Sequence, residues 1–396
     1  MTPAQTPKQR AAPAPVRALY QCGQSVWLDY IRRCIIQSGE LRRLVEEEGI
    51  RGVTSNPAIF EKAIAGSPDY DGAIYNSAIY DGAFQSLLTS GYREPIVVYE
   101  LLAVADIQSA ADILRPVYES SRYQDGYVSL EVSPYLAHDT EQTLEEARRL
   151  WQVVDRPNLM IKIPATSAGI PAIQQLIGEG INVNVTLLFS RRAYAEVAEA
   201  YLTGLESLMA AGGDLSRVAS VASFFVSRLD VVVDECLDKV SQVGEDTRKQ
   251  AMAESLKGEI AIANAKLAYQ SYQALCESSR WRILALQGAQ PQRLLWASTG
   301  TKNPRYSDVL YVEELIGPHT INTMPPATLA AFQDHGRVRP SLLANVDDAD
   351  AALKDLALLG ISLDNIADDL LAKAVQGFIE AFDSLLDAVK EKLADL

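Results

Sequence analysis

Eight short, largely apolar runs recur along the chain, and longer segments with apolar residues three and four positions apart separate them. The runs have the length of strands, and the segments between them have the spacing of amphipathic helices. Strands that alternate with helices form parallel sheets, and eight such units close into a barrel. The sequence therefore predicts an α/β fold, a (β/α)8 TIM barrel. The predicted strands are residues 25–30, 52–56, 126–133, 159–164, 181–187, 218–225, 294–298 and 320–323.

Helices are predicted between these strands, and further helices are expected outside the repeating units. Residues 54–90 exceed a single crossover and should carry extra helices, and residues 366–396 predict a C-terminal helix beyond the eighth strand. The clearest helical patterns between strands cover residues 96–119, 143–154, 191–210 and 247–277.

One barrel domain over residues 19–396 is expected, because the chain shows no internal repeat and no linker-like stretch. Residues 1–18 predict a disordered N-terminal tail, since prolines recur there without an apolar block. A short organelle transit peptide is the alternative, because this stretch holds basic residues and no acid.

Composition narrows the possible partners. The formal net charge is −15, which argues against nucleic acid or an anionic membrane surface as a partner. An anionic substrate then needs a local basic pocket. No apolar run approaches the roughly 18 residues that suggest a membrane span. The three histidines and four cysteines show no metal-ligand spacing, so we expect no metal site and reduced thiols in a cytoplasmic protein.

Lys162 lies in an apolar strand, which is an unusual place for its side chain. Burial of an ammonium group disfavours its charged form, and a neutral amine can attack a carbonyl carbon to form a Schiff base. The alternative is a strand-end lysine whose head group reaches water. The run alone does not choose between these two interpretations.

Polar residues recur where the predicted strands end, which is where barrel enzymes place their catalytic groups. Each has a structural alternative: Asn56 precedes a proline and fits a turn or cap, Glu131 fits an outward-facing strand position, and Asn184 with Thr186 fits a helix-facing side. Their recurrence at one end of seven strands favours a site. The set is Asp29, Thr54, Asn56, Glu131, Lys162, Asn184, Thr186, Ser223, Arg228 and Ser298.

Six motifs together resemble the transaldolase family, in the right order from about residue 24 to about residue 336, and most closely its longer bacterial branch. They are Gln-Ser-Val-Trp-Leu-Asp29, Gly52-Val-Thr-Ser-Asn-Pro-Ala-Ile-Phe60, Ile161-Lys-Ile-Pro-Ala-Thr166, Asn182-Val-Asn-Val-Thr-Leu-Leu-Phe189, Ser223-Phe-Phe-Val-Ser-Arg-Leu-Asp230 and Trp296-Ala-Ser-Thr-Gly-Thr-Lys-Asn-Pro304.

The resemblance implies a class I mechanism without metal or cofactor. Lys162 forms the Schiff base with a ketose phosphate, and Asp29 takes the proton of the C4 hydroxyl as the C3–C4 bond breaks. Glu131 and Thr186 hold a water that shuttles protons. The resemblance also implies that Asn56, Asn184 and Ser223 bind hydroxyls with Thr54 in support, and that Arg228, Ser298 and Lys302 bind the phosphate.

The reaction implied is transfer of dihydroxyacetone from sedoheptulose 7-phosphate to glyceraldehyde 3-phosphate, within the pentose phosphate pathway, by a monomer or small homo-oligomer. Fructose-6-phosphate aldolase, which releases free dihydroxyacetone, is a related alternative. That branch has Gln in place of Glu131 and Tyr in place of Phe225, so both residues favour the transferase. A non-catalytic barrel that serves as a binding protein is the alternative from another class.

Overall fold

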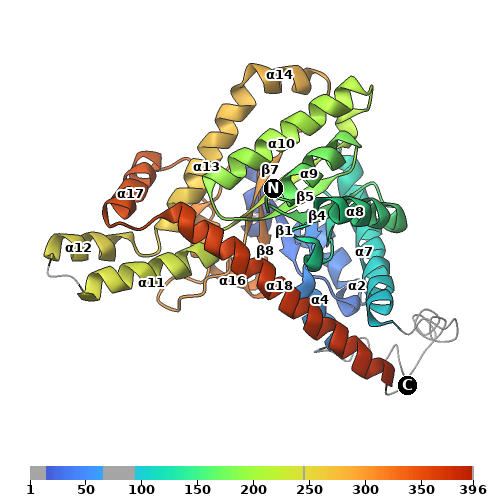
Figure 1. Cartoon of the computed structure of the whole chain (residues 1–396), viewed down its shortest axis with the longest axis horizontal. Coiled ribbons are helices and arrows are strands. Elements are labelled where there is room, and N and C mark those ends of the chain that lie inside the picture. The colour runs from blue at the N-terminus through green and yellow to red at the C-terminus, as the bar shows by residue number, and fades with distance from the viewer. Residues whose placement is uncertain (1–14, 66–93, 244–245, 395–396) are drawn as a thin grey trace, which may run out of the picture.

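Eight parallel strands form a closed barrel at the centre of the molecule, in the order of the chain (Figure 1). The computed structural model describes residues 15–65, 94–243 and 246–394. Strand β1 pairs with both β2 and β8, which closes the barrel. The strands are β1 (Gln24–Asp29), β2 (Gly52–Thr54), β3 (Tyr127–Glu131), β4 (Leu159–Pro164), β5 (Val183–Leu188), β6 (Ser220–Phe225), β7 (Arg293–Ala297) and β8 (Thr320–Met324).

Helices surround the barrel and cover the outer face of its strands (Figure 1). Because helices lie outside and packed side chains inside, strands such as β4 and β6 are buried at every position. Short turns of other helix types lie at Leu44–Glu48 (π), Pro134–Leu136 and Leu215–Arg217 (both 3-10). The α-helices are α1 (Pro15–Gln21), α2 (Arg33–Gln37), α3 (Glu40–Arg43), α4 (Pro57–Ala65), α7 (Pro95–Ser120), α8 (Thr140–Val154), α9 (Gly169–Gly178), α10 (Arg191–Ala210), α11 (Ser227–Val243), α12 (Thr247–Leu256), α13 (Ile260–Glu277), α14 (Ser279–Leu286), α15 (Leu310–Glu314), α16 (Pro326–His335), α17 (Val346–Leu358) and α18 (Leu363–Ala394).

The predicted barrel with a C-terminal helix is confirmed, with two corrections to its helices. The single helix predicted over residues 247–277 is wrong, because α12 and α13 are separate helices. Gly258 lies between them with φ +75°, a left-handed conformation that interrupts an α-helix. A Cβ atom there would also lie 2.9 Å from the Tyr306 ring, so a glycine is needed for two reasons.

The tail predicted over residues 1–18 is wrong in its last four residues, because these already belong to α1. Val16 and Leu19 of α1 are buried, which ties this helix to the core beside β1. Residues 1–14 lie outside the described residues, as do residues 66–93 of the region in which extra helices were predicted. Of that region the structure describes α4.

Helix α18 runs diagonally across the front of the barrel in Figure 1. It contacts α4, α7, α11 and β5, which come from widely separated parts of the chain. Phe378 and Phe382 on its buried face reach the residues that follow the strands. The C-terminal helix therefore contributes side chains to two cavities near the ends of the strands. No helix in the described part of the chain is long and apolar enough to cross a membrane.

Candidate active site

The carboxyl ends of the strands surround a cavity of about 340 Å³. Ten of the twelve predicted site residues line it. The other two also belong to the site, because Glu131 contacts Lys162 and Asn184 accepts a hydrogen bond from Ser223. The ten lining residues are Asp29, Thr54, Asn56, Lys162, Thr186, Ser223, Phe225, Arg228, Ser298 and Lys302.

Lys162 is buried at the wall of this cavity, with 5% of its side chain exposed. Its ammonium group donates a hydrogen bond to the carbonyl oxygen of Ser55 at 3.0 Å and lies 3.3 Å from Glu131 Oε2. A strand-end lysine that reaches bulk water is therefore not what the structure shows. Nζ is instead held beside a carboxyl group at the edge of a substrate-sized space.

Strand register explains how Glu131, Lys162 and Asn184 come together. In the barrel, Glu131 pairs with Lys162 across β3 and β4, and Lys162 pairs with Asn184 across β4 and β5. Paired residues on parallel strands point to the same face of the sheet. The outward-facing alternatives for Glu131 and Asn184 are therefore wrong: these residues form one inward layer with the lysine.

Asn184 is fully buried and is oriented by two side chains. Its Nδ2 donates to Ser129 Oγ at 2.9 Å, and its Oδ1 accepts from Ser223 Oγ at 2.7 Å. Two residues further along β5, Thr186 lines the cavity, and its buried Oγ1 has no hydrogen-bond partner among the described protein atoms. That hydroxyl is free to bind water or substrate at the cavity wall.

The Asp29 carboxyl group ends β1 on the other side of the cavity. Thr54 Oγ1 donates to Asp29 Oδ1 at 2.7 Å, so the Thr323 hydroxyl, 2.7 Å from Thr54 Oγ1, must be the donor of the second bond. Burial raises the pKa of Asp29, while Lys162, the Thr54 hydroxyl, Arg228 and Lys302 oppose the rise. Burial likewise raises the pKa of Glu131, and Lys162 opposes it.

The basic side of the cavity is formed by Arg228, Lys302 and Lys62. Arg228 is the second residue of α11, and its guanidinium lies 5.4 Å from the centre of the Phe225 ring. Partial desolvation beside the cavity lowers the pKa of Lys302, and repulsion from Arg228 and Lys62 lowers it further. Three cations thus share one end of the cavity, which suits an anionic substrate group in an acidic protein.

Arg228 does not pair with Asp230, the structural alternative that its position in the sequence allows. Asp230 instead accepts hydrogen bonds from the Ala261 amide at 2.7 Å and from the Tyr311 hydroxyl at 2.9 Å. Asn56 caps the start of α4, because its Oδ1 accepts from the Ile59 amide at 2.9 Å, and the residue also lines the cavity.

Backbone irregularities shape two of the strand ends. The pairing of β5 with β6 shifts between Val185 and Leu188, and Leu187 has φ +61°, as in a β-bulge. Ser298 follows β7 with φ +56°, and its hydroxyl lies 3.0 Å from Ser227 Oγ. Positive φ is uncommon for residues other than glycine and is concentrated at functional sites.

The sequence gives no distinctive signal for several residues that line the cavity. Lys62 and Thr323 line the cavity, but a basic residue on a helix and a threonine in a strand are common features with no distinctive signal. Phe378 lies on α18, and its ring centre is 5.9 Å from Lys162 Nζ. Only the docking of α18 brings that ring to the lysine. Among the residues that the structure describes, no His, Cys, Asp and Glu side chains group as metal ligands do.

Comparisons with known proteins agree over nearly the whole chain. A sequence model of the family described as Transaldolase/Fructose-6-phosphate aldolase matches residues 26–389. A protein named Transaldolase 2 from Nostoc punctiforme is 51% identical over 377 residues, which cover 94% of this chain and 96% of that protein. A protein named Transaldolase from Thermobifida fusca is 46% identical over 382 residues, which cover 96% and 99% respectively.

Proposed function

Because this chain belongs to the transaldolase/fructose-6-phosphate aldolase family, we propose that it is a transaldolase that works through a Schiff base on Lys162. It transfers a dihydroxyacetone unit from sedoheptulose 7-phosphate to glyceraldehyde 3-phosphate, giving erythrose 4-phosphate and fructose 6-phosphate. The observation that carries the proposal is the buried Lys162 amine beside Glu131, at the wall of a cavity that also holds Asp29.

Imine formation begins when the Lys162 amine attacks the keto carbon of the donor sugar. The carbinolamine loses its hydroxyl as water, which requires a proton donor next to the lysine. Glu131 is 3.3 Å from Nζ, and burial raises its pKa, so it is suited to give and take this proton. The unpaired Thr186 hydroxyl supports the role of holding the shuttling water.

Carbon–carbon cleavage then uses Asp29. Its carboxylate accepts the proton of the C4 hydroxyl, the C3–C4 bond breaks, and the bonding electrons pass into the iminium to leave an enamine on Lys162. The aldehyde product departs, and the enamine attacks the acceptor aldehyde in the reverse sense. A raised pKa makes Asp29 a stronger base than an exposed aspartate, which favours proton removal.

Two further sets of residues bind the rest of the substrate: neutral polar groups bind its hydroxyls, and a largely basic set binds its phosphate. Asn56, Asn184 and Ser223 bind the hydroxyls of the retained unit, a role that the fixed amide of Asn184 supports. Thr54 supports this set indirectly, since its hydroxyl is directed to Asp29. The residues that bind the phosphate are Arg228, Ser298 and Lys302, with Lys62 on the same side of the cavity.

Glu131 and Phe225 favour the transferase over the aldolase branch of the family. Both residues lie at the site, Glu131 beside Lys162 and Phe225 in the cavity wall. A full set of acid, base and amine also argues against a barrel that only binds. The substrates are then sugar phosphates, and we propose that the enzyme is cytoplasmic and is a monomer or small homo-oligomer. Light scattering on the purified chain can check the oligomeric state.

Borohydride trapping tests the proposal. Incubation with fructose 6-phosphate and borohydride should add a reduced dihydroxyacetone unit to the peptide that contains Lys162, and Lys162→Arg should abolish both the label and turnover. Lys266 is the internal control, because it is also buried but donates to the Ala344 carbonyl away from the cavity. A label on Lys266 or on no lysine would contradict the mechanism.

A further inference from the structure

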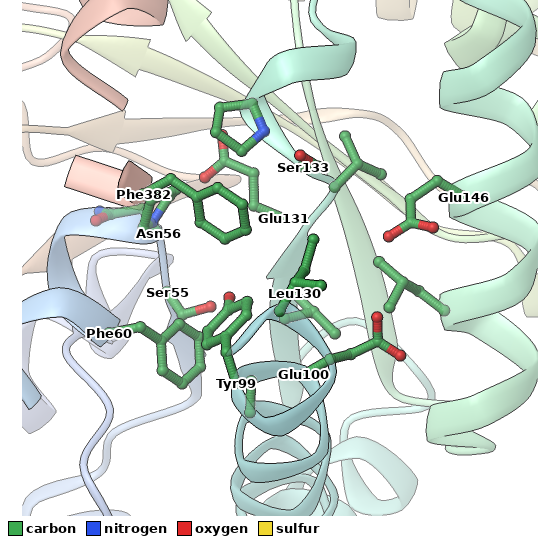
Figure 2. Close-up of a pocket in the computed structure, with 16 residues that line it drawn as sticks. Ser55, Asn56, Phe60, Tyr99, Glu100, Leu130, Glu131, Ser133, Glu146 and Phe382 are labelled. Atoms are coloured by element: carbon green, nitrogen blue, oxygen red, sulfur yellow. The ribbon is translucent and has the colours of Figure 1, made fainter. Parts of the chain in front are cut away.

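A second, smaller cavity lies behind the Glu131 carboxyl group, among residues of β3, α4, α7, α8 and α18 (Figure 2). Its volume is about 40 Å³. Since about 10–15 Å³ suffices for one water molecule, the cavity has room for at least one water. Glu131 lines this cavity and also contacts Lys162, so its carboxyl group lies between the catalytic lysine and the second cavity.

Two buried side-chain oxygens at this cavity have no hydrogen-bond partner among the residues that the structure describes. They are Ser133 Oγ and Glu131 Oε2, and the latter forms an ion pair with Lys162 Nζ at 3.3 Å. The Tyr99 hydroxyl is a third polar group beside this cavity. Buried polar groups left without partners are costly, so a polar ligand within the cavity is expected.

The Tyr99 ring is held rigidly at the cavity wall. It packs edge-on against Phe60 of α4 and Phe382 of α18, with ring centres 5.7 Å and 5.4 Å apart. In Figure 2 its hydroxyl points to the side of the cavity where Phe382 and the Glu131 carboxyl group lie. Burial raises the pKa of Tyr99, and the negative charge of Glu131 raises it further. Tyr99 is therefore a neutral hydrogen-bond donor across the working pH range.

We propose that Tyr99 is a positioning residue that hydrogen-bonds to Glu131 through water held in this cavity. The bridging water donates to the carboxylate and accepts from the Tyr99 hydroxyl, which stabilises the ionised form of Glu131 and fixes its orientation toward Lys162. The inference rests on the proposed function, in which Glu131 moves the protons of imine formation.

Other charged groups also face Glu131, and they stay the same when Tyr99 is changed. Lys162, Asp29 and Arg228 act on it from the catalytic cavity. Glu100 and Glu146 line the second cavity, but both pair with the Arg149 guanidinium at 2.5 to 2.9 Å, toward the surface. A change seen on removal of the Tyr99 hydroxyl alone is then attributable to that hydroxyl.

Tyr99→Phe removes the hydroxyl and keeps the ring packing. The rate of imine formation, measured by quenching with borohydride at timed intervals, should fall about three- to tenfold, as expected for one neutral hydrogen bond. The step in the pH profile of this rate that reflects ionisation of Glu131 should shift to higher pH. The Glu131 carboxylate loses a hydrogen-bond donor, so the pKa of Glu131 rises.

Tyr135→Phe is the matched control. Tyr135 packs edge-on against the same Phe382 ring at 5.5 Å, but its exposed hydroxyl donates to Asp383 instead. This variant should keep the wild-type rate and pH profile. If Tyr99→Phe also keeps both, the proposal is overturned.

Crystal structures of the wild type and Tyr99→Phe supply a test that needs no catalysis. A water within hydrogen-bond distance of both Tyr99 and Glu131, displaced or lost in the variant, supports the inference. A dry cavity in the wild type overturns it. A chain that forms no imine but holds this water would refute the proposed function alone, so the two failures are distinguishable.

Discussion

At the scale of single residues, the Asp29 carboxyl group accepts a hydrogen bond from Thr54 and, in the proposed mechanism, also accepts the proton of the C4 hydroxyl. Asp29→Asn keeps an oxygen that can accept from Thr54, but the amide cannot accept the proton of the C4 hydroxyl. We therefore expect donor sugar to form a trappable imine on Lys162 while transfer falls at least about 10²-fold. Borohydride trapping and a transfer assay on the same preparation measure the two steps.

Stability provides the control for this variant. Because burial raises the pKa of Asp29, the folded protein holds that proton more tightly than the unfolded chain does. Ionisation of Asp29 therefore costs stability as pH rises from the unfolded pKa through the folded one. Asp29→Asn should melt no lower than the wild type at neutral pH. A lower melting temperature with near-normal turnover would make Asp29 a structural residue.

Single residues could be predicted from the sequence where their chemistry conflicts with their surroundings. Lys162 is a cation in an apolar strand, and Glu131 is an acid at the end of another. Thr323 and Lys62 carry no such conflict, and Tyr99 has the spacing of an ordinary helix residue. Their places in the two cavities depend on tertiary packing that no local pattern encodes.

At the scale of elements, the turn from β6 to α11 sets the position of Arg228, which we propose as a ligand of the phosphate. Phe225 ends β6, and Arg228 follows in the first turn of α11. We expect Arg228→Ala to weaken phosphorylated donors by about 2–4 kcal/mol, in the range for loss of a partly buried charged partner. Unphosphorylated fructose should change far less, and steady-state kinetics on both sugars measures the difference.

Arg305→Ala is the matched control, since Arg305 is exposed and lies outside the cavity lining. It should leave both donors unchanged. Equal losses for phosphorylated and unphosphorylated sugars in Arg228→Ala, together with a lowered melting temperature, would remove Arg228 from the site.

Elements could be predicted where a periodic pattern runs unbroken. All eight strands were identifiable, and α18 begins three residues before its predicted start. The division into α12 and α13 was missed because the apolar spacing continues through Gly258, and only its positive φ reveals the break. The bulge at Leu187 was missed for a similar reason, since strand alternation gives no sign of a local register shift.

At the scale of the whole molecule, activity should not depend on a metal ion. The iminium on Lys162 accepts the electrons of the broken bond, so a Lewis acid is unnecessary in the proposed mechanism. Dialysis against EDTA should leave transfer activity unchanged. Loss of activity that zinc or another divalent ion restores would refute this, and a wild-type sample dialysed without chelator is the control.

The barrel and the location of its site could be predicted from the alternation of strands and helices. Eight such units commonly close into a (β/α)8 barrel, which places its active site at the carboxyl ends of the strands. What could not be predicted is how the segment after β8 returns to the site. The C-terminal helix is plain in the sequence, but its apolar stripe fits many surfaces, so its docking on α4, α7 and α11 is visible only in the structure.

That docking has a consequence for the timing of synthesis. Phe378 lies over Lys162, and Phe382 closes the cavity behind Glu131, so both cavities need the last helix of the chain. Translation delivers residues from the amino end, and all eight strands leave the ribosome before α18 does. A nascent chain can therefore carry every proposed catalytic group and still lack a finished site. We therefore expect catalysis only once α18 has been made, and a fragment that ends before Leu363 should be inactive.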